Sequence, residues 1–275
     1  MKVTVLLENT VCNPRFRCEH GLSLHIETEH HRVLFDMGPN AMFLENAEEL
    51  GVDIRAVDTA VLSHAHNDHC GGLELFCRRN DRAPVYLQKE VWGEYYVVTP
   101  QKRAYIGMDP SLRRYGDRFR LTEGDTVLDG ELRLFSGIPT RDYWSHANDT
   151  LREKRGDEYP MDTFRHEQHL LVTEGGKTVL FAGCAHGGIV NILRRAEELL
   201  GHAPDAVFAG FHLYNPSLRQ SEPRELVEAI GRELAAREHT KYYTGHCTGG
   251  EAFAVLRGIL GDRLGTIHGG AVIGI

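Results

Sequence analysis

The stretch TAVLSHAHNDHCGG, residues 59–72, places three histidines and a carboxylate directly after a strand-like apolar run. His64 and His66 are two residues apart, so in extended chain their side chains point the same way and can share one metal ion. Asp68 and His69 lie past the turn and can serve a second ion or orient the first. The alternative is a polar loop whose histidines cap a helix or hydrogen-bond each other. However, ligand-type side chains packed this closely would repel one another when protonated, unless they share a function such as metal binding. The stretch therefore predicts a metal site at the end of a strand.

The composition is that of a globular protein with a surplus of histidine. The chain has 275 residues, a net charge of −8 and 16 histidines, and histidine is the commonest metal ligand. No run of four basic residues occurs, so we expect a small-molecule substrate and no nucleic-acid partner. The N-terminal apolar run is too short for a signal peptide or a membrane span, and 6 cysteines are too few for a disulfide scaffold. We therefore expect a soluble cytoplasmic protein with free thiols. Nothing in the sequence indicates its oligomeric state.

The first half of the chain begins with β-type runs and then alternates between helix and strand patterns. Three opening runs predict an antiparallel start, at 2–7, 22–28 and 32–37. Helix patterns follow at 40–50, 71–79 and 89–97, and strand patterns at 59–63, 84–88, 118–121 and 131–135. The segments 98–118 and 137–165 have little periodicity, so we expect irregular structure that builds the substrate pocket.

The second half repeats one theme three times: an apolar strand, a loop rich in glycine, histidine and cysteine, and a helix. The three strands are predicted at 177–182, 205–209 and 240–244. Helices are predicted at about 188–200 and 223–237, and a third follows GHCTGG and ends at about 260. Closing strands are predicted within 264–274. No repeat, low-complexity tract or linker interrupts the chain, so we expect a single α/β domain over residues 1–275, with chemistry in the loops at strand ends.

A metal site needs ligands from distant segments, and the strand-end loops supply them. The candidates are His166 or His169, Cys184 with His186, and His246 with Cys247. Zinc suits this mixture of imidazole, carboxylate and thiolate groups, and Mn²⁺ or Fe²⁺ also accept histidine and aspartate.

These motifs resemble those of a known family. The run SHAHNDHCGGL is similar to the HxHxDH signature of the metallo-β-lactamase superfamily, whose fold is a four-layer αββα sandwich with metals at one edge. The whole chain resembles the branch of dihydropterin ribofuranosyl-aminobenzene-phosphate synthase-like proteins. The matching segments are ENT (8–10), EHGLSLHIE (19–27), LFDMG (34–38), HEQ (166–168), GCAHGGIVNIL (183–193), GFHL (210–213) and GHCTGG (245–250).

The resemblance implies roles for particular residues. His64 and His66 would bind the first metal, and Asp68, His69 and His246 the second. The third ligand of the first metal is either His166, at the start of a strand, or His186, in the GCxH loop typical of this branch.

Cys184 stands where many members of the superfamily place an aspartate that bridges both metals. A thiolate at this position binds zinc well, but without the bridging carboxylate the sequence does not decide between one ion and two. His169 fits a structural role better.

Several other residues have both a functional and a structural interpretation. Asp36 in LFDMG is either a carboxylate that orients a metal ligand or a turn residue. His212 in GFHL either lines the substrate pocket or is a satisfied structural histidine. Cys247 is predicted to be a packed thiol. Three charged residues of the long irregular segment can meet an anionic substrate or simply be solvated: Arg141, His146 and Arg152.

Together these features predict a metal-dependent hydrolase that cleaves an ester, lactone, thioester or phosphoester, with Asp68 orienting the attacking water and taking its proton. Two alternatives stay open. The branch name implies synthase-like chemistry on a phosphorylated pterin or ribosyl compound, and a closed four-ligand site would suit a metal sensor without turnover.

Overall fold

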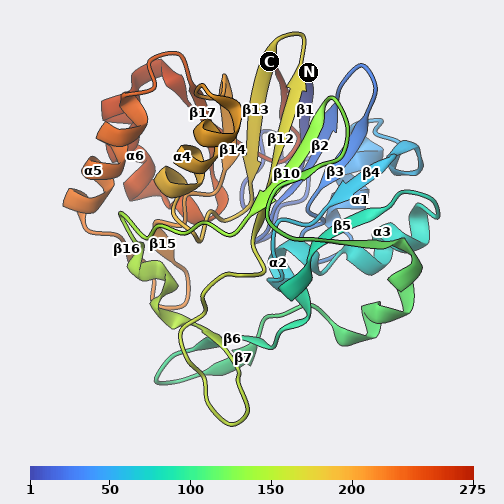
Figure 1. The fold of residues 1–275 in the computed structure, drawn as a ribbon, viewed down its shortest axis with the longest axis horizontal. Helices are drawn as coiled ribbons and strands as arrows, with labels where there is room; N and C mark the ends of the chain where they lie inside the picture. The colour runs from blue at the N-terminus through green and yellow to red at the C-terminus, as the bar shows by residue number, and fades with distance from the viewer.

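The computed structural model describes residues 1–275 and has four layers, in which two seven-stranded sheets pack face to face and helices cover the outer face of each (Figure 1). This is the predicted αββα sandwich, which is confirmed. The first sheet has the order β19 (Val272–Gly274), β1 (Lys2–Leu7), β2 (Ser23–Glu27), β3 (Arg32–Phe35), β4 (Thr59–Val61), β5 (Val85–Gln88), β8 (Phe119–Thr122). The second has the order β18 (Leu264–Thr266), β17 (Lys241–Thr244), β14 (Ala206–Ala209), β13 (Lys177–Ala182), β12 (Gln168–Glu174), β10 (Leu132–Ser136), β9 (Thr126–Val127).

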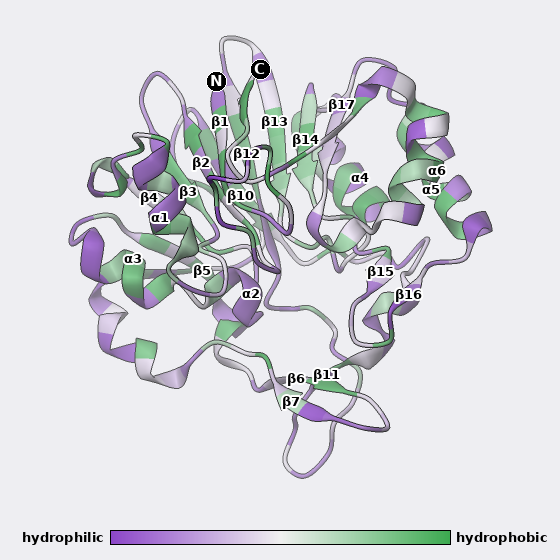
Figure 2. Ribbon diagram, turned by 180° about the vertical axis from the view of Figure 1, so that it is seen from behind, coloured by the Kyte–Doolittle hydropathy of each residue, from purple (hydrophilic) through white to green (hydrophobic).

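Three apolar layers hold the sandwich together, and the green ribbon segments of Figure 2 follow them through the sheets. The central layer lies between the two sheets, where the Phe35 and Phe181 rings are 6.0 Å apart and Phe181 stacks on Phe208 at 5.2 Å. On the first sheet pack α1 (Met42–Glu49), α2 (Asn67–Cys70) and α3 (Leu73–Arg79). On the second pack α4 (Ile189–Leu200), α5 (Arg224–Ala235) and α6 (Gly250–Leu260). No helix combines the length and the apolar character that crossing a bilayer requires.

The strand directions bring the loops that carry the motifs together. β1, β2 and β3 are antiparallel, as predicted, whereas β3, β4, β5 and β8 run parallel. In the second sheet β13, β14, β17 and β18 also run parallel. The carboxyl ends of parallel strands meet at one edge of a sheet. The loops after β4, β13, β14 and β17 therefore lie at the same end of the sandwich.

Two sequence predictions are corrected by the structure. The helix expected over 89–97 is a short 3₁₀ turn, η2 (Lys89–Trp92), followed by β6 (Tyr95–Val98), because Tyr95 to Val98 are aromatic and β-branched. The segments expected to be irregular contribute strands to one small sheet, in which β11 (Leu151–Glu153), β6 and β7 (Arg103–Tyr105) are neighbours. These strands are short and come from separate segments, so no periodicity marks them. 3₁₀ turns elsewhere are η1 (Ile54–Ala56), η3 (Pro110–Arg118), η4 (His146–Thr150), η5 (His246–Thr248) and η6 (Gly261–Arg263).

His169 on β12 is a buried histidine that weakens the fold in acid. Neither of its ring nitrogens has a hydrogen-bond partner, and burial lowers the pKa of the ring to about 3. Below pH 6.5 the unfolded chain takes up a proton that the folded chain refuses, so stability falls as the pH drops from 6.5 towards 3. When the pH is lowered from 7.5 to 5, we expect the unfolding free energy of His169→Leu to decrease by about 2 kcal/mol less than that of the wild type. Urea unfolding at both pH values measures this difference, with the exposed His202→Gln as control. An identical pH dependence in wild type and His169→Leu would contradict it.

Candidate metal centre

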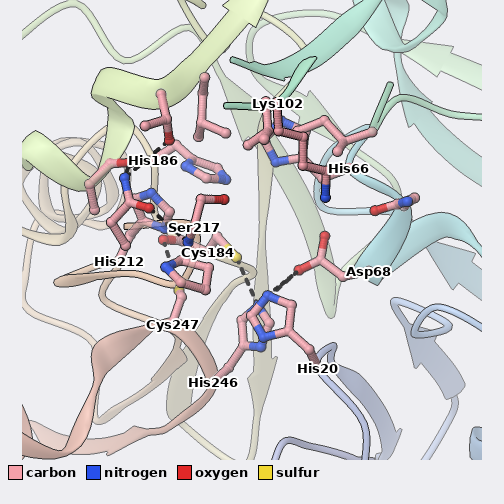
Figure 3. Close-up of a pocket in the computed structure, with 18 residues that line it drawn as sticks. His20, His66, Asp68, Lys102, Cys184, His186, His212, Ser217, His246 and Cys247 are labelled. Atoms are coloured by element: carbon pink, nitrogen blue, oxygen red, sulfur yellow. Dashed lines mark hydrogen bonds and ion pairs between the residues drawn. The ribbon is translucent and has the colours of Figure 1, made fainter. Parts of the chain in front are cut away.

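The loops after β4, β13, β14 and β17 surround a pocket of about 190 Å³ (Figure 3). Its floor contains several of the predicted ligands, and its walls come from the small sheet and from the loop after β14. The lining residues that bear on the chemistry are His20, His66, Asp68, Lys102, Cys184, His186, His212, His246 and Cys247. Residues of both segments 98–118 and 137–165 also line the pocket: Lys102, Ile106, Ala147, Thr150 and Leu151.

One group of four side chains has the geometry of a tetrahedral metal site. Its members are Asp68, His69, Cys184 and His246. The Cys184 Sγ lies 3.1 Å from both His69 Nε2 and His246 Nε2, and these two nitrogens are 3.2 Å apart. The Asp68 Oδ2 lies 3.2 Å from His246 Nε2 and 3.6 Å from His69 Nε2. Ligand atoms bound at about 2.1 Å around a tetrahedral ion are about 3.4 Å apart. The four side chains therefore fit one ion of zinc's size.

The acidic groups of this site attract positive charge, which the His246 ring supplies as a bound proton when no ion is present. Burial alone would lower the pKa of His246, but Cys247 and Asp68 raise it to about 9. Burial would raise the pKa of the Asp68 carboxyl, yet the His69 and His246 rings hold it well below its usual range. Asp68 is therefore an ionised carboxylate beside buried imidazoles, as a metal ligand must be.

A second group, of three histidines, lies next to the first. The ring centroids of His64, His66 and His186 are 4.7 to 4.9 Å apart. Burial, reinforced by the neighbouring rings, lowers the pKa of His64 and His186 well below its usual value, and burial also lowers that of His66. The rings are therefore neutral at pH 7. Nε2 of each ring is buried without a hydrogen-bond partner, and an unpaired buried nitrogen of this kind costs stability unless something binds it.

Cys184 and Asp68 lie between the two groups. The Cys184 Sγ is within 4.8 Å of ligand atoms of His64 and His186 as well as of its own group. A carboxylate oxygen of Asp68 is within 4.8 Å of ligand atoms of His64 and His66. Both side chains therefore lie within reach of ligand atoms of both groups.

The structure distinguishes His186 from His166. Both ring nitrogens of His166 are engaged: Nδ1 accepts from the Ala65 backbone N–H at 3.1 Å, and Nε2 donates to Asp162 at 3.0 Å. His186 uses only Nδ1, which donates to Asn148 at 3.0 Å. His186 therefore has an unpaired nitrogen, whereas both nitrogens of His166 have protein partners, although His166, Asp162 and His66 also lie close enough together to hold an ion.

Each of four histidines in the two groups has its Nδ1 held by a protein oxygen, which leaves Nε2 facing the centre. His64 donates to Ser63 Oγ at 2.8 Å and His69 to Asp36 Oδ2 at 2.6 Å. His246 donates to Asn9 Oδ1 at 2.8 Å, and His186 is held by Asn148. Partners of this kind set the tautomer and orientation of metal-binding histidines.

Asp36 is both a turn residue and an orienting residue. Its φ of 58° lies in the left-handed region, and its carboxylate is fully buried. Oδ2 accepts from His69 Nδ1 and from Ser63 Oγ, the latter at 2.7 Å, and Ser63 in turn accepts from His64. One carboxylate therefore orients a histidine of each group. Three further residues of the centre have a positive φ that is costly without glycine: Ala185, His212 and His246.

Three other residues of the centre have no role predicted from the sequence, although Glu167 lies in the HEQ segment (166–168). Asp162 contacts His166 at 3.0 Å and lies 3.9 Å from His66 Nε2. Glu167 accepts from the backbone N–H groups of His186 at 2.7 Å and Gly187 at 2.9 Å, and so fixes the loop that carries His186. Asn148 and Asp162 lie in the polar segment 137–165, where only the fold shows which side chain turns inward.

The remaining candidates are placed as follows. His212 lines the pocket, 4.2 Å from the His186 ring, and both of its buried ring nitrogens lack a partner. Cys247 is buried, with its Sγ within 4.8 Å of Cys184 Sγ. Arg141, His146 and Arg152 do not line the pocket: Arg141 and Arg152 donate to backbone carbonyls, and His146 to Glu222.

The glycine pair after the histidine motif serves close packing rather than an unusual turn. Gly71 and Gly72 have helical backbone angles, with φ of −61° and −79°. A Cβ on Gly71 would lie 2.3 Å from the Pro39 carbonyl oxygen, and one on Gly72 would lie 2.3 Å from that of Met37. The absence of side chains lets the motif pack against the loop after β3.

Comparisons with known proteins agree with this geometry. Residues 17–246 match the model of the metallo-beta-lactamase superfamily. The chain is 30% identical over 224 residues to the uncharacterized protein MJ0448 of Methanocaldococcus jannaschii, covering 78% of this chain and 80% of that protein. It is 27% identical to the 7,8-dihydropterin-6-methyl-4-(β-D-ribofuranosyl)-aminobenzene-5′-phosphate synthase of the same organism, covering 95% of this chain and 92% of the synthase. Its fold is similar to the crystal structure of Tm1679, a metal-dependent hydrolase of the β-lactamase superfamily, with a TM-score of 0.82 and 26% identity over 100% of this chain and 99% of that one.

Proposed function

This chain belongs to the metallo-β-lactamase superfamily, and we propose that it is a metal-dependent hydrolase of small-molecule esters, lactones, thioesters or phosphoesters. The observation that carries the proposal is the pair of ligand groups beside one pocket. The first has four mixed ligands, and the second has three neighbouring histidine rings, each with an unpaired Nε2. The relationship to Tm1679 supports the same class of reaction.

We assign the ligands as two sets. His64, His66 and His186 hold one ion, and Asp68, His69, Cys184 and His246 hold the other. His186 is preferred to His166 because its Nε2 is free. The mixture of imidazole, thiolate and carboxylate favours zinc.

When bound, two divalent ions activate water and polarise the group that it attacks. The chain's own residues orient the reactants and handle the proton. Asp68 directs Oδ2 towards His69 and His246, so Oδ1 can accept the proton of the attacking water. His212, which has unpaired ring nitrogens in the pocket wall, can hydrogen-bond a substrate oxygen.

One feature favours an enzyme over a metal sensor, and another supports synthase chemistry as a second candidate. A set of three histidines would leave room for water on a bound ion, and His66 and His186 line the pocket, which favours turnover over a closed sensor site. The 27% identity to the dihydropterin synthase extends over nearly both chains and supports that chemistry as the second candidate. Synthase activity requires joining a phosphorylated ribosyl substrate to a second molecule, which distinguishes it from hydrolysis in an assay.

The test is an assay of metal-stripped and reconstituted protein on 4-nitrophenyl acetate, a γ-lactone, an acyl thioester and bis(4-nitrophenyl) phosphate. We expect hydrolysis of at least one substrate to disappear with the metal and to return with stoichiometric Zn²⁺ or Mn²⁺. Undiminished activity in a preparation shown to be metal-free would overturn metal dependence. Full metal loading with no hydrolysis of any class would overturn the hydrolase assignment.

A further inference from the structure

The pocket above the candidate metal centre is bordered by two hairpins from opposite halves of the chain. The β6–β7 hairpin contributes Val97, Lys102 and Ile106, and the hairpin between β15 (Tyr214–Asn215) and β16 (Gln220–Ser221) contributes Pro216 and Ser217. In Figure 3, Lys102 lies on the same side of the pocket as His66, away from His20 and His246. A ligand that fills the pocket therefore extends from the histidines to these hairpins.

Lys102 is the only lysine or arginine among the residues that line the pocket. Its side chain makes no ion pair, whereas Lys2, Lys89 and Lys154 are each paired with a glutamate. Lys154 is a close comparison because it lies beside the same small sheet but contacts Glu94 and does not line the pocket. The Lys102 ammonium is thus available to a ligand.

Apolar side chains also line the pocket. Val97, Ile106 and Leu151 come from the small sheet and the loops beside it, and Pro216 comes from the other hairpin. His212, 6% exposed and with both ring nitrogens unpaired, adds a polar contact near His186. The pocket therefore combines candidate metal ligands, several apolar side chains and one ammonium group.

We propose that Lys102 determines specificity for substrates that carry a carboxylate or phosphate group in addition to the bond that is cleaved. Such an anion gains a charge-assisted hydrogen bond from the ammonium, and the apolar body of the substrate packs against Val97 and Ile106. This proposal rests on the proposed hydrolase function. It assigns Lys102 to substrate binding and to no step of the reaction.

The test compares two esters that differ only in terminal charge, 4-nitrophenyl butyrate and 4-nitrophenyl hemisuccinate, on the metal-loaded enzyme. We expect Lys102→Ala to raise KM for the hemisuccinate about tenfold with kcat unchanged, and to leave KM for the butyrate unchanged. Lys102→Glu should raise the hemisuccinate KM further, and Lys102→Arg should restore it. Lys154→Ala is the matched control and should behave as wild type. Equal effects of Lys102→Ala on both esters, or no effect on either, would overturn the proposal.

A binding measurement separates this proposal from the hydrolase assignment. Calorimetric titration with succinate requires no turnover, and we expect Lys102→Ala to weaken succinate binding about tenfold relative to wild type and Lys154→Ala. If neither ester is hydrolysed, this difference in succinate affinity supports the anion site independently of the hydrolase function. Equal succinate affinities in wild type and Lys102→Ala would overturn the anion site.

Discussion

Replacing His186 with alanine is expected to remove one metal equivalent and to lower kcat/KM on the order of 10³-fold. His186 supplies the third Nε2 of the group that it forms with His64 and His66, and Asn148 holds the ring in that orientation. Two histidines alone hold a divalent ion weakly, since structural and catalytic zinc sites use three or four protein ligands. Metal content by mass spectrometry and hydrolysis of the best substrate measure the two effects together.

His166→Gln is the control for this experiment, since His166 is buried beside the same ligands but has both nitrogens engaged. We expect this variant to retain both metal equivalents and to lose about 1–3 kcal/mol of stability because Asp162 and the Ala65 N–H lose a partner. Loss of a metal equivalent in His166→Gln, together with full loading of His186→Ala, would reverse the ligand assignment.

Replacing Cys184 with alanine is expected to release the ion held by the mixed group and to reduce kcat/KM on the order of 10²-fold or more. The Cys184 Sγ contacts Nε2 of both His69 and His246 at 3.1 Å, so its removal deletes one vertex of the tetrahedron. Cys184→Asp should recover part of the metal content, because a carboxylate is also a zinc ligand.

Cys247→Ala provides a matched control, since the second thiol is equally buried and its Sγ lies within 4.8 Å of the first. This variant should keep two metal equivalents. If the two alanine variants lose the same amount of metal, the assignment of Cys184 rather than Cys247 as the metal ligand is contradicted. Metal quantification after gel filtration decides between these outcomes.

The fold was accessible from the sequence because its signals are local and periodic. The apolar strands at 177–182, 205–209 and 240–244 are followed by glycine-rich loops and helices, and the structure has β13, β14 and β17 at these positions, with helices after them. The small sheet was not accessible in this way. Its strands, β6, β7 and β11, are short and come from two separate segments, so their pairing depends on tertiary contacts.

The sequence indicates those candidate ligands that stand together directly after a strand. It does not indicate those whose role depends on a hydrogen-bond partner in a distant segment. His64, His66, Asp68 and His69 stand together in the chain, so their spacing alone indicates a metal. The choice between His166 and His186 depends on hydrogen bonds to Asp162 and Asn148, which lie in a segment without periodicity. Asp36 was predicted as either an orienting carboxylate or a turn residue, and its link to a histidine of each group depends on Ser63, which only the structure reveals.

The most direct test of the two-ion assignment is a crystal structure of the metal-loaded protein with anomalous data collected at the zinc edge. The expected result is two anomalous peaks, one bound by His64, His66 and His186 and the other by Asp68, His69, Cys184 and His246. A peak bound by His66, Asp162 and His166, or the absence of a peak at the four-ligand group, would contradict it.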